Sequence, residues 1–143
     1  MAEFSCNGLD DLMLSLQEIA AIPEEVQDEM LRAGAEVVAQ AQREKVRAYG
    51  IYDGSSPRHV ADSIKPGKVK LKKGQRIIYV SPTGSRRRGK TVTRNSEILF
   101  VNEYGRRGQK ARPAVRDANE ASAEATTAAQ AEVYDKYLRS KDL

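Results

Sequence analysis

The spacing of apolar residues changes twice along this chain, and these changes constrain its fold more than any other feature. From Pro23 to Gly50 the apolar residues recur every three or four positions, as on an amphipathic helix, in the stripe Val26, Met30, Ala33, Val37 and Ala41. From residue 68 the period becomes two, which is typical of a strand with one solvated face. From about residue 117 to 138 an alanine-rich stretch again favours a helix. This order predicts an α+β fold in a single domain, residues 1–143.

The middle of the chain predicts a small antiparallel sheet of about three to four strands. The sheet is expected to pack against the long N-terminal helix and the C-terminal alanine-rich helix. We expect strands at residues 68–72, 76–80 and 98–104, the last because Ile98 begins four consecutive apolar residues. A flexible basic loop, residues 82–96, joins the last two strands. A shorter helix is expected at residues 10–19, and residues 60–64 are expected to form a short helical turn or to start a strand.

Charge is strongly segregated along the chain, although the net charge is only +4. The balance is −7 over residues 1–57, +14 over residues 58–116 and −3 over residues 117–143. This segregation indicates an anionic partner or an acidic surface on a neighbouring subunit. With one Cys and one His, an intrachain disulfide is impossible and a zinc site is not expected, so we expect no cofactor and no metal. No apolar run approaches the ~20 residues of a membrane span, and no membrane partner is expected.

The densest cluster of cations lies in the loop of residues 82–96, which has no acidic residue. Such a loop can bind phosphates without reading base sequence, and the competing interpretation is a solvated hairpin tip. The candidate phosphate-facing residues are Arg86, Arg87, Arg88, Lys90 and Arg94. The loop has no aromatic residue, which disfavours stacking on single-stranded bases.

Residues 84–91 (GSRRRGKT) also fit the phosphate-loop pattern G-x-x-x-x-G-K-[ST]. A true phosphate loop leads directly into a helix whose N-terminal amides hold the phosphates. Val92 and Thr93 are β-branched, and the next predicted strand begins too soon for a parallel crossover. We therefore do not expect an NTPase. No catalytic triad or supported carboxylate pair is evident, so we expect the protein not to be an enzyme.

The segment between the third predicted strand and the last helix is the candidate subunit interface. Gly105 ends the strand, residues 106–112 are cationic, and a proline restarts the chain towards the helix. The candidate interface residues are Glu103, Tyr104, Gly105, Arg106, Arg107, Arg112 and Pro113. The acidic start of the first long helix (Glu24, Glu25, Asp28 and Glu29) is a plausible complement, although acids at a helix start are also expected for the helix dipole.

Two short stretches resemble a known family. Residues 60–64 (VADSI) are similar to its Leu-x-x-Ser-Ile segment. Its apolar strand ends in Val-Glu-[Phe/Tyr]-Gly, and Ala-Arg-Pro-Phe then opens a helix that contains alanine. The matching residues are Val101, Glu103, Tyr104, Gly105, Ala111, Arg112, Pro113, Arg116 and Ala118. On these residues the chain resembles the tail-completion or neck (head–tail joining) proteins of long-tailed double-stranded DNA phages. Ala114 stands where the family has Phe, so a packing role for that aromatic is not carried over.

The resemblance implies a structural virion protein that completes the tail or joins head to tail as a ring around the DNA path. The implied partners are copies of the chain, with six-fold symmetry expected from the family, neighbouring tail or head-connector proteins, and double-stranded DNA passing through irrespective of sequence. The implied location is the virion, at the head–tail junction or tail end, and the host cytoplasm during assembly. The alternative from the residues is a sequence-independent nucleic-acid-binding module that uses the basic middle segment.

Overall fold

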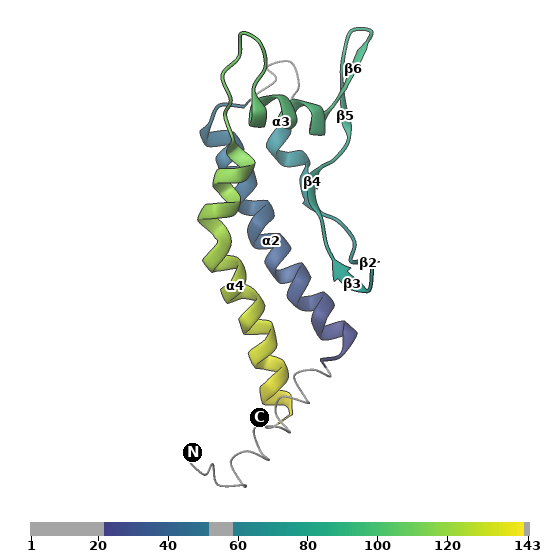
Figure 1. The fold of residues 1–143 in the computed structure, drawn as a ribbon. Helices are drawn as coiled ribbons and strands as arrows, with labels where there is room; N and C mark the ends of the chain where they lie inside the picture. Colours follow the sequence, from purple (N-terminus) through teal and green to yellow (C-terminus); the bar gives the residue numbers. More distant parts are fainter. Residues whose placement is uncertain (1–21, 52–58, 142–143) are drawn as a thin grey trace.

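Two long antiparallel helices form the body of the protein (Figure 1). A computed structural model describes residues 22–51 and 59–141. Helix α2 spans Glu24–Ala48, and helix α4 spans Ala114–Ser140 and packs along it. Three small antiparallel ladders and one further helix lie beside this pair. The predicted α+β class, with a long N-terminal helix and a C-terminal helix packed against it, is therefore confirmed.

Helix α2 begins and ends where the sequence predicts. Pro23 occupies the N-cap position, Glu24 and Glu25 lie in the first turn, and Lys45 and Arg47 lie in the last turn, so charge at both ends complements the helix dipole. Gly50 follows with φ 67°, a conformation that favours glycine and ends the helix. At 1.5 Å per residue, the 25 residues of α2 extend about 37 Å. The helix expected at residues 10–19 lies outside the described residues.

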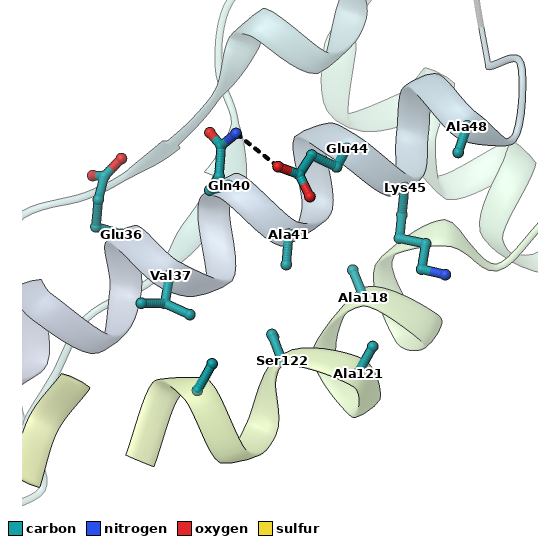
Figure 2. Close-up of a pocket in the computed structure, with 11 residues that line it drawn as sticks. Glu36, Val37, Gln40, Ala41, Glu44, Lys45, Ala48, Ala118, Ala121 and Ser122 are labelled. Atoms are coloured by element: carbon teal, nitrogen blue, oxygen red, sulfur yellow. Dashed lines mark hydrogen bonds between the residues drawn. The ribbon is translucent and has the colours of Figure 1, made fainter. Parts of the chain in front are cut away.

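The contact between α2 and α4 is made largely of small side chains. Ala35 and Ala39 of α2 are buried, as are Ala114, Ala118 and Ser122 of α4. Val37 and Ala41, which belong to the predicted apolar stripe, are only half-buried, because the fully buried face is rotated from that stripe. They line a groove between the two helices instead (Figure 2). On α4, Ala121, Ala125 and Ala128 are exposed, so only part of its alanine-rich surface is buried against α2.

The larger buried side chains gather at one end of the helix pair. Val46, Ile51, Val60 and Ile64 are essentially fully buried there and are joined by Leu99. Burying four such aliphatic side chains contributes on the order of 6–12 kcal/mol before conformational entropy is subtracted. This is a small core for the part of the chain that the structure describes, as the absence of Trp and the high alanine content predict.

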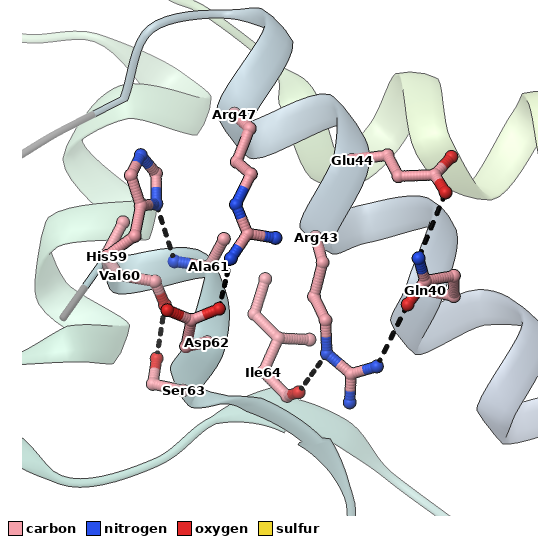
Figure 3. A network of polar contacts seen from close by, with 10 residues as sticks. All are labelled: Gln40, Arg43, Glu44, Arg47, His59, Val60, Ala61, Asp62, Ser63 and Ile64. Carbon is pink, nitrogen blue, oxygen red and sulfur yellow. Dashed lines mark hydrogen bonds and ion pairs between the residues drawn. The ribbon is translucent and has the colours of Figure 1, made fainter.

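Side chains of the C-terminal half of α2 bind the segment that follows the helix (Figure 3). That segment is a 3₁₀ turn, η1 (Val60–Ser63), followed by strand β1 (Ile64–Pro66). The Arg43 Nε donates to the carbonyl oxygen of Ile64 at 2.9 Å, and Arg47 forms an ion pair with Asp62. The His59 Nδ1 accepts from the backbone N–H of Ala61 at 3.1 Å and caps η1. Residues 60–64 thus form both of the elements that the sequence left open.

The strands form three separate two-stranded ladders, not one sheet of three to four strands. β1 pairs with β4 (Val80–Pro82), β2 (Lys70–Lys72) with β3 (Gln75–Ile77), and β5 (Ser85–Arg88) with β6 (Thr91–Arg94). All three pairings are antiparallel. Lys73 and Gly74, both at positive φ, form the tight turn between β2 and β3. Each strand has only three or four residues.

Two predictions for the region 82–104 were wrong. Residues 82–96 are not an open loop, because they contain the β5–β6 hairpin. Residues 98–104 are not a strand but belong to helix α3, Asn95–Tyr104. A run of four apolar residues does not distinguish a strand from a short helix by periodicity. The burial pattern is helical, since Asn95, Leu99 and Asn102 are buried while Phe100 and Tyr104 are exposed.

Candidate functional surfaces

The β5–β6 hairpin forms a basic arm, residues 85–94, that extends from the end of the helix pair where α3 lies (Figure 1). Arg87, Lys90 and Arg94 are exposed along it. The Arg86 Nε instead donates to Asn95 Oδ1 at 2.8 Å, and the Asn95 amide donates to the carbonyl oxygen of Thr83 at 2.7 Å. Arg86 therefore helps to fix the base of the arm to α3. The side chain of Arg88 lies outside the described set.

The phosphate-loop pattern at residues 84–91 is not built as a phosphate loop. Gly89 and Lys90 form the turn of the hairpin, and Thr91 opens strand β6, not a helix. The following helix, α3, begins only at Asn95, beyond the pattern. The backbone amides of a helix N-terminus are therefore not placed where bound phosphates would need them.

The α3–α4 connection, residues 103–113, is held by contacts within the chain. The Glu103 carboxylate accepts from the backbone N–H groups of Val115 and Arg116, at 3.0 and 2.9 Å, and so caps the start of α4. Gly105 ends α3 at φ 75°, and a Cβ there would lie 2.9 Å from the backbone of Gln109 and Ala111. Only glycine fits this close approach. Two candidate interface residues therefore have structural roles in their own subunit.

Arg112 also bonds within its own chain. Its Nη2 donates to Asn102 Oδ1 at 2.8 Å, and its Nη1 donates to the carbonyl oxygen of Tyr49 at 3.2 Å. The Arg112 backbone N–H donates to the Asn102 carbonyl oxygen at 2.6 Å. Arg112 thus ties the connection to α3 and to the end of α2. Pro113 occupies the N-cap position of α4.

The remaining candidate interface residues face solvent. Arg106 and Arg107 are exposed in a tight turn, in which Arg106 and Gln109 exchange backbone hydrogen bonds of 3.1 and 2.9 Å. Tyr104 is 71% exposed. These three side chains are available to a partner, unlike Glu103 and Arg112.

The acidic start of α2, the proposed complement of the cationic connection, is partly occupied. Arg76 on β3 forms two hydrogen bonds with the Asp28 carboxylate, at 2.6 and 2.8 Å, and lies 3.5 Å from Glu24. The hydrogen bond from Arg76 lowers the pKa of Asp28 below its ordinary value. Glu25 and Glu29 remain exposed.

A second coupled pair lies where α2 meets α4. The Tyr49 hydroxyl donates to the Asp117 carboxylate. This hydrogen bond raises the pKa of Tyr49 and lowers the pKa of Asp117. Asp117 also accepts from Arg116, at 3.2 Å. The pair ties the first turn of α4 to the end of α2.

Two surfaces that sequence reasoning missed are hollowed. The groove between α2 and α4, of about 720 Å³, is walled by alanines and by Val37, with Glu36, Gln40, Glu44 and Lys45 along its α2 side (Figure 2). The other surface lies on α3, where the rings of Phe100 and Tyr104 are exposed with centroids 4.9 Å apart. The spacing of these two aromatics, four residues, places them on one face of a helix. That signal was in the sequence but carries this meaning only once residues 95–104 are known to be helical.

Within residues 22–51 and 59–141, no group of three His, Cys, Asp or Glu side chains is arranged to hold a metal ion. None of the described helices is long and apolar enough to cross a membrane. No protein-family model, curated protein or solved structure matches the chain significantly.

Proposed function

We propose that this protein is a structural component of a tailed-phage virion, which completes the tail or joins head to tail as an oligomeric ring around the DNA path. The observation that carries the proposal is the basic arm, a hairpin that holds exposed cations away from the body. The resemblance of residues 101–118 to neck and tail-completion proteins supplies the biological setting. The proposed locations are the virion and, during assembly, the host cytoplasm.

The arm has the chemistry for contact with duplex DNA that is independent of sequence. Its exposed Arg87, Lys90 and Arg94 present guanidinium and ammonium groups, which bind phosphates. Residues 85–94 contain no carboxylate to repel the DNA backbone and no aromatic ring to stack on unpaired bases. These properties suit a protein past which DNA moves, because contacts to phosphates are the same for every base sequence.

The body supports an assembly role. Within residues 22–51 and 59–141 the core of large side chains is small, and the groove between α2 and α4 and the aromatic face of α3 present apolar surface. Oligomerisation buries such surface. The proposed partners are further copies of the chain in a ring, with six-fold symmetry as the starting hypothesis, and neighbouring tail or head-connector proteins.

The test is the oligomeric state of the purified protein at low salt without DNA. We expect a discrete ring by light scattering and negative-stain electron microscopy, with a central channel wide enough for a duplex. A monomer that binds duplex DNA would favour the alternative, a sequence-independent nucleic-acid-binding module. That alternative draws on the same arm, so ring formation without DNA is what separates the two. A protein that neither assembles nor retains DNA would contradict both.

A further inference from the structure

The exposed face of helix α3 has the form of a docking site for another polypeptide. Phe100 and Tyr104 are 64% and 71% exposed and lie against each other at its centre. A groove of about 440 Å³ runs beside them, with apolar walls that include Val80, Leu99 and Val115. A second hollow lies on the other side of Phe100, next to Ser96, Glu97 and Val101. Exposed aromatic rings beside apolar hollows are typical of the anchoring centre of a protein interface.

Cations lie at both ends of α3 and on the wall of the groove. Arg94 immediately precedes α3, Arg106 and Arg107 follow its end, and Arg116 forms part of the groove wall. Glu103, on the same helix, has its carboxylate engaged by the amides at the start of α4. The surface therefore fits a segment that combines apolar side chains with carboxylates.

Residues 1–21 of this chain have that composition. They contain four acidic residues and no Lys or Arg. Their larger apolar side chains are Met1, Phe4, Leu9, Leu12, Met13, Leu14, Leu16 and Ile19.

Chain length directs the residues nearest to α2, from Leu12 to Ile19, to another copy. Helix α2 starts at the opposite end of the helix pair from α3 (Figure 1), about 37 Å away along its axis. An extended chain spans at most about 3.6 Å per residue, so Leu14, Leu16 and Ile19 reach at most about 29, 22 and 11 Å from Ile22. Most of the apolar side chains therefore cannot reach α3 of their own chain.

We propose that the α3 surface receives residues 1–21 of a neighbouring copy, whose apolar side chains cover Phe100 and Tyr104 while its carboxylates meet the nearby arginines. Because residues 1–21 join the body at the start of α2, at the opposite end from α3, the contact is head-to-tail, the type that forms a ring where its rotation closes. The inference rests on the proposed assembly function, for which it supplies the contact between copies.

Single-stranded nucleic acid is the other occupant with a suitable chemistry, since bases stack on aromatic rings beside cations. Two observations favour a polypeptide. The two rings are tilted by 53° and pack on each other, and the neighbouring groove has walls that include aliphatic side chains.

Photocrosslinking from position 96 tests the proposal in the full chain. Ser96 is exposed and lines both hollows, so the Cys6→Ser/Ser96→Cys variant carries a single thiol for a benzophenone label there. The labelled protein is mixed with ¹⁵N-labelled wild type and irradiated. We expect crosslinks from position 96 to residues 1–21 of the other isotope. The control, Cys6→Ser/Lys72→Cys on the exposed β2–β3 hairpin, should give few such links. Crosslinks to residues 1–21 only within one copy, or none to that segment, would overturn the proposal.

Loss of the aromatic rings is the second test. Phe100→Ser/Tyr104→Ser changes two exposed side chains and should weaken self-association at least about tenfold in sedimentation velocity. The matched control is Leu71→Ser/Tyr79→Ser, which removes two exposed apolar side chains elsewhere. Equal association of wild type and the α3 variant would refute the contact. So would oligothymidylate binding that the α3 variant abolishes without any change in association.

The two proposals can fail separately. If the α3 contact is wrong but the assembly function is right, the wild type still forms a ring and the crosslinks from position 96 miss residues 1–21. If the assembly function is wrong, the wild type forms no ring, whatever the basic arm binds.

Discussion

At the scale of single residues, Arg112 connects three parts of the molecule. Its guanidinium bonds to Asn102 on α3 and to the backbone at the end of α2, while Pro113 beside it opens α4. We predict that Arg112→Ala lowers the free energy of unfolding by about 1–2 kcal/mol, because Asn102 is buried and loses a charged partner. Arg112→Lys should recover only part of this loss. Lysine has a single compact ammonium and lacks the planar guanidinium fork that reaches both acceptors.

Urea unfolding followed by circular dichroism measures this effect. Arg107→Ala is the control, since Arg107 is exposed in the same connection, and it should stay within about 0.5 kcal/mol of wild type. A loss for Arg112→Ala no larger than for Arg107→Ala would show that these bonds contribute nothing to stability.

The Tyr49–Asp117 pair should make stability depend on pH at both extremes. The Tyr49 hydrogen bond lowers the pKa of Asp117, so this contribution is present above the unfolded value of about 3.9 and is lost as pH falls through the folded pKa. The same bond raises the pKa of Tyr49, so the contribution is present below about pH 10 and is lost as pH rises through the folded pKa. We predict that wild type is more stable than Tyr49→Phe from about pH 5 to 9, and that the difference shrinks on either side.

Thermal unfolding across pH 3 to 11 checks this prediction. Tyr104→Phe is the matched control, because the Tyr104 side chain is mostly exposed, and its difference from wild type should be small and independent of pH. A Tyr49→Phe difference that is the same at every pH would mean that the hydroxyl stabilises the fold by packing alone.

At the scale of elements, the basic arm is the part most directly tied to DNA. Arg87→Ser/Lys90→Ser/Arg94→Ser removes its exposed cations and leaves the Arg86–Asn95 bond in place. We predict weaker retention of duplex DNA, equal for unrelated sequences, and a slope of log affinity against log salt that is shallower by up to about three.

The control removes the same charge from another hairpin and its entry, in Lys68→Ser/Lys70→Ser/Lys73→Ser, where all three side chains are exposed. Filter binding at several salt concentrations compares the two variants. An equal loss of DNA affinity in both variants would mean that binding depends on the total charge of the protein and not on the arm.

Some of these elements could be predicted from the sequence and others could not. Helix α2 could be predicted from Pro23 to Gly50, because its periodicity, its terminal charges and its final glycine all agree. Helix α3 could not, because Ile98 to Val101 are apolar in a row and nothing local excludes a strand. The first residue of the helix has partners outside it, since Asn95 accepts from Arg86 and donates to the carbonyl oxygen of Thr83, and these contacts cannot be read from the segment itself.

The candidate sites also differ in how much of them the sequence predicts. Composition alone was enough to mark the arm as cationic. The inward bonds of Glu103 and Arg112 join residues 10 to 63 positions apart in the chain, so spacing could not reveal them. The separation into three short ladders likewise depends on tertiary contacts that alternation along one strand does not encode.

At the scale of the whole molecule, the exposed arginines of the α3–α4 connection should govern assembly. We predict that Arg106→Glu/Arg107→Glu dissociates the oligomer while each subunit stays folded, because both side chains face solvent and like charges across an interface cost several kcal/mol. Arg112 is left intact because it supports the fold. Light scattering reports the assembly and circular dichroism the fold. An unchanged oligomer would exclude these two arginines from the interface.

The helix pair that forms the body should stay together even when the chain between the two helices is cut. Helices α2 and α4 come from the two sides of the arm in sequence, yet they make the most extensive contact between any two of the described elements. A single cut by trypsin after Lys90, in the exposed turn, should therefore yield two fragments that remain bound and elute together. Separated in denaturant, neither fragment holds both helices, so each should stay unfolded alone and regain helicity when mixed with the other. Fragments that separate on native gel filtration would show that the peptide link through the arm is required to keep the pair together.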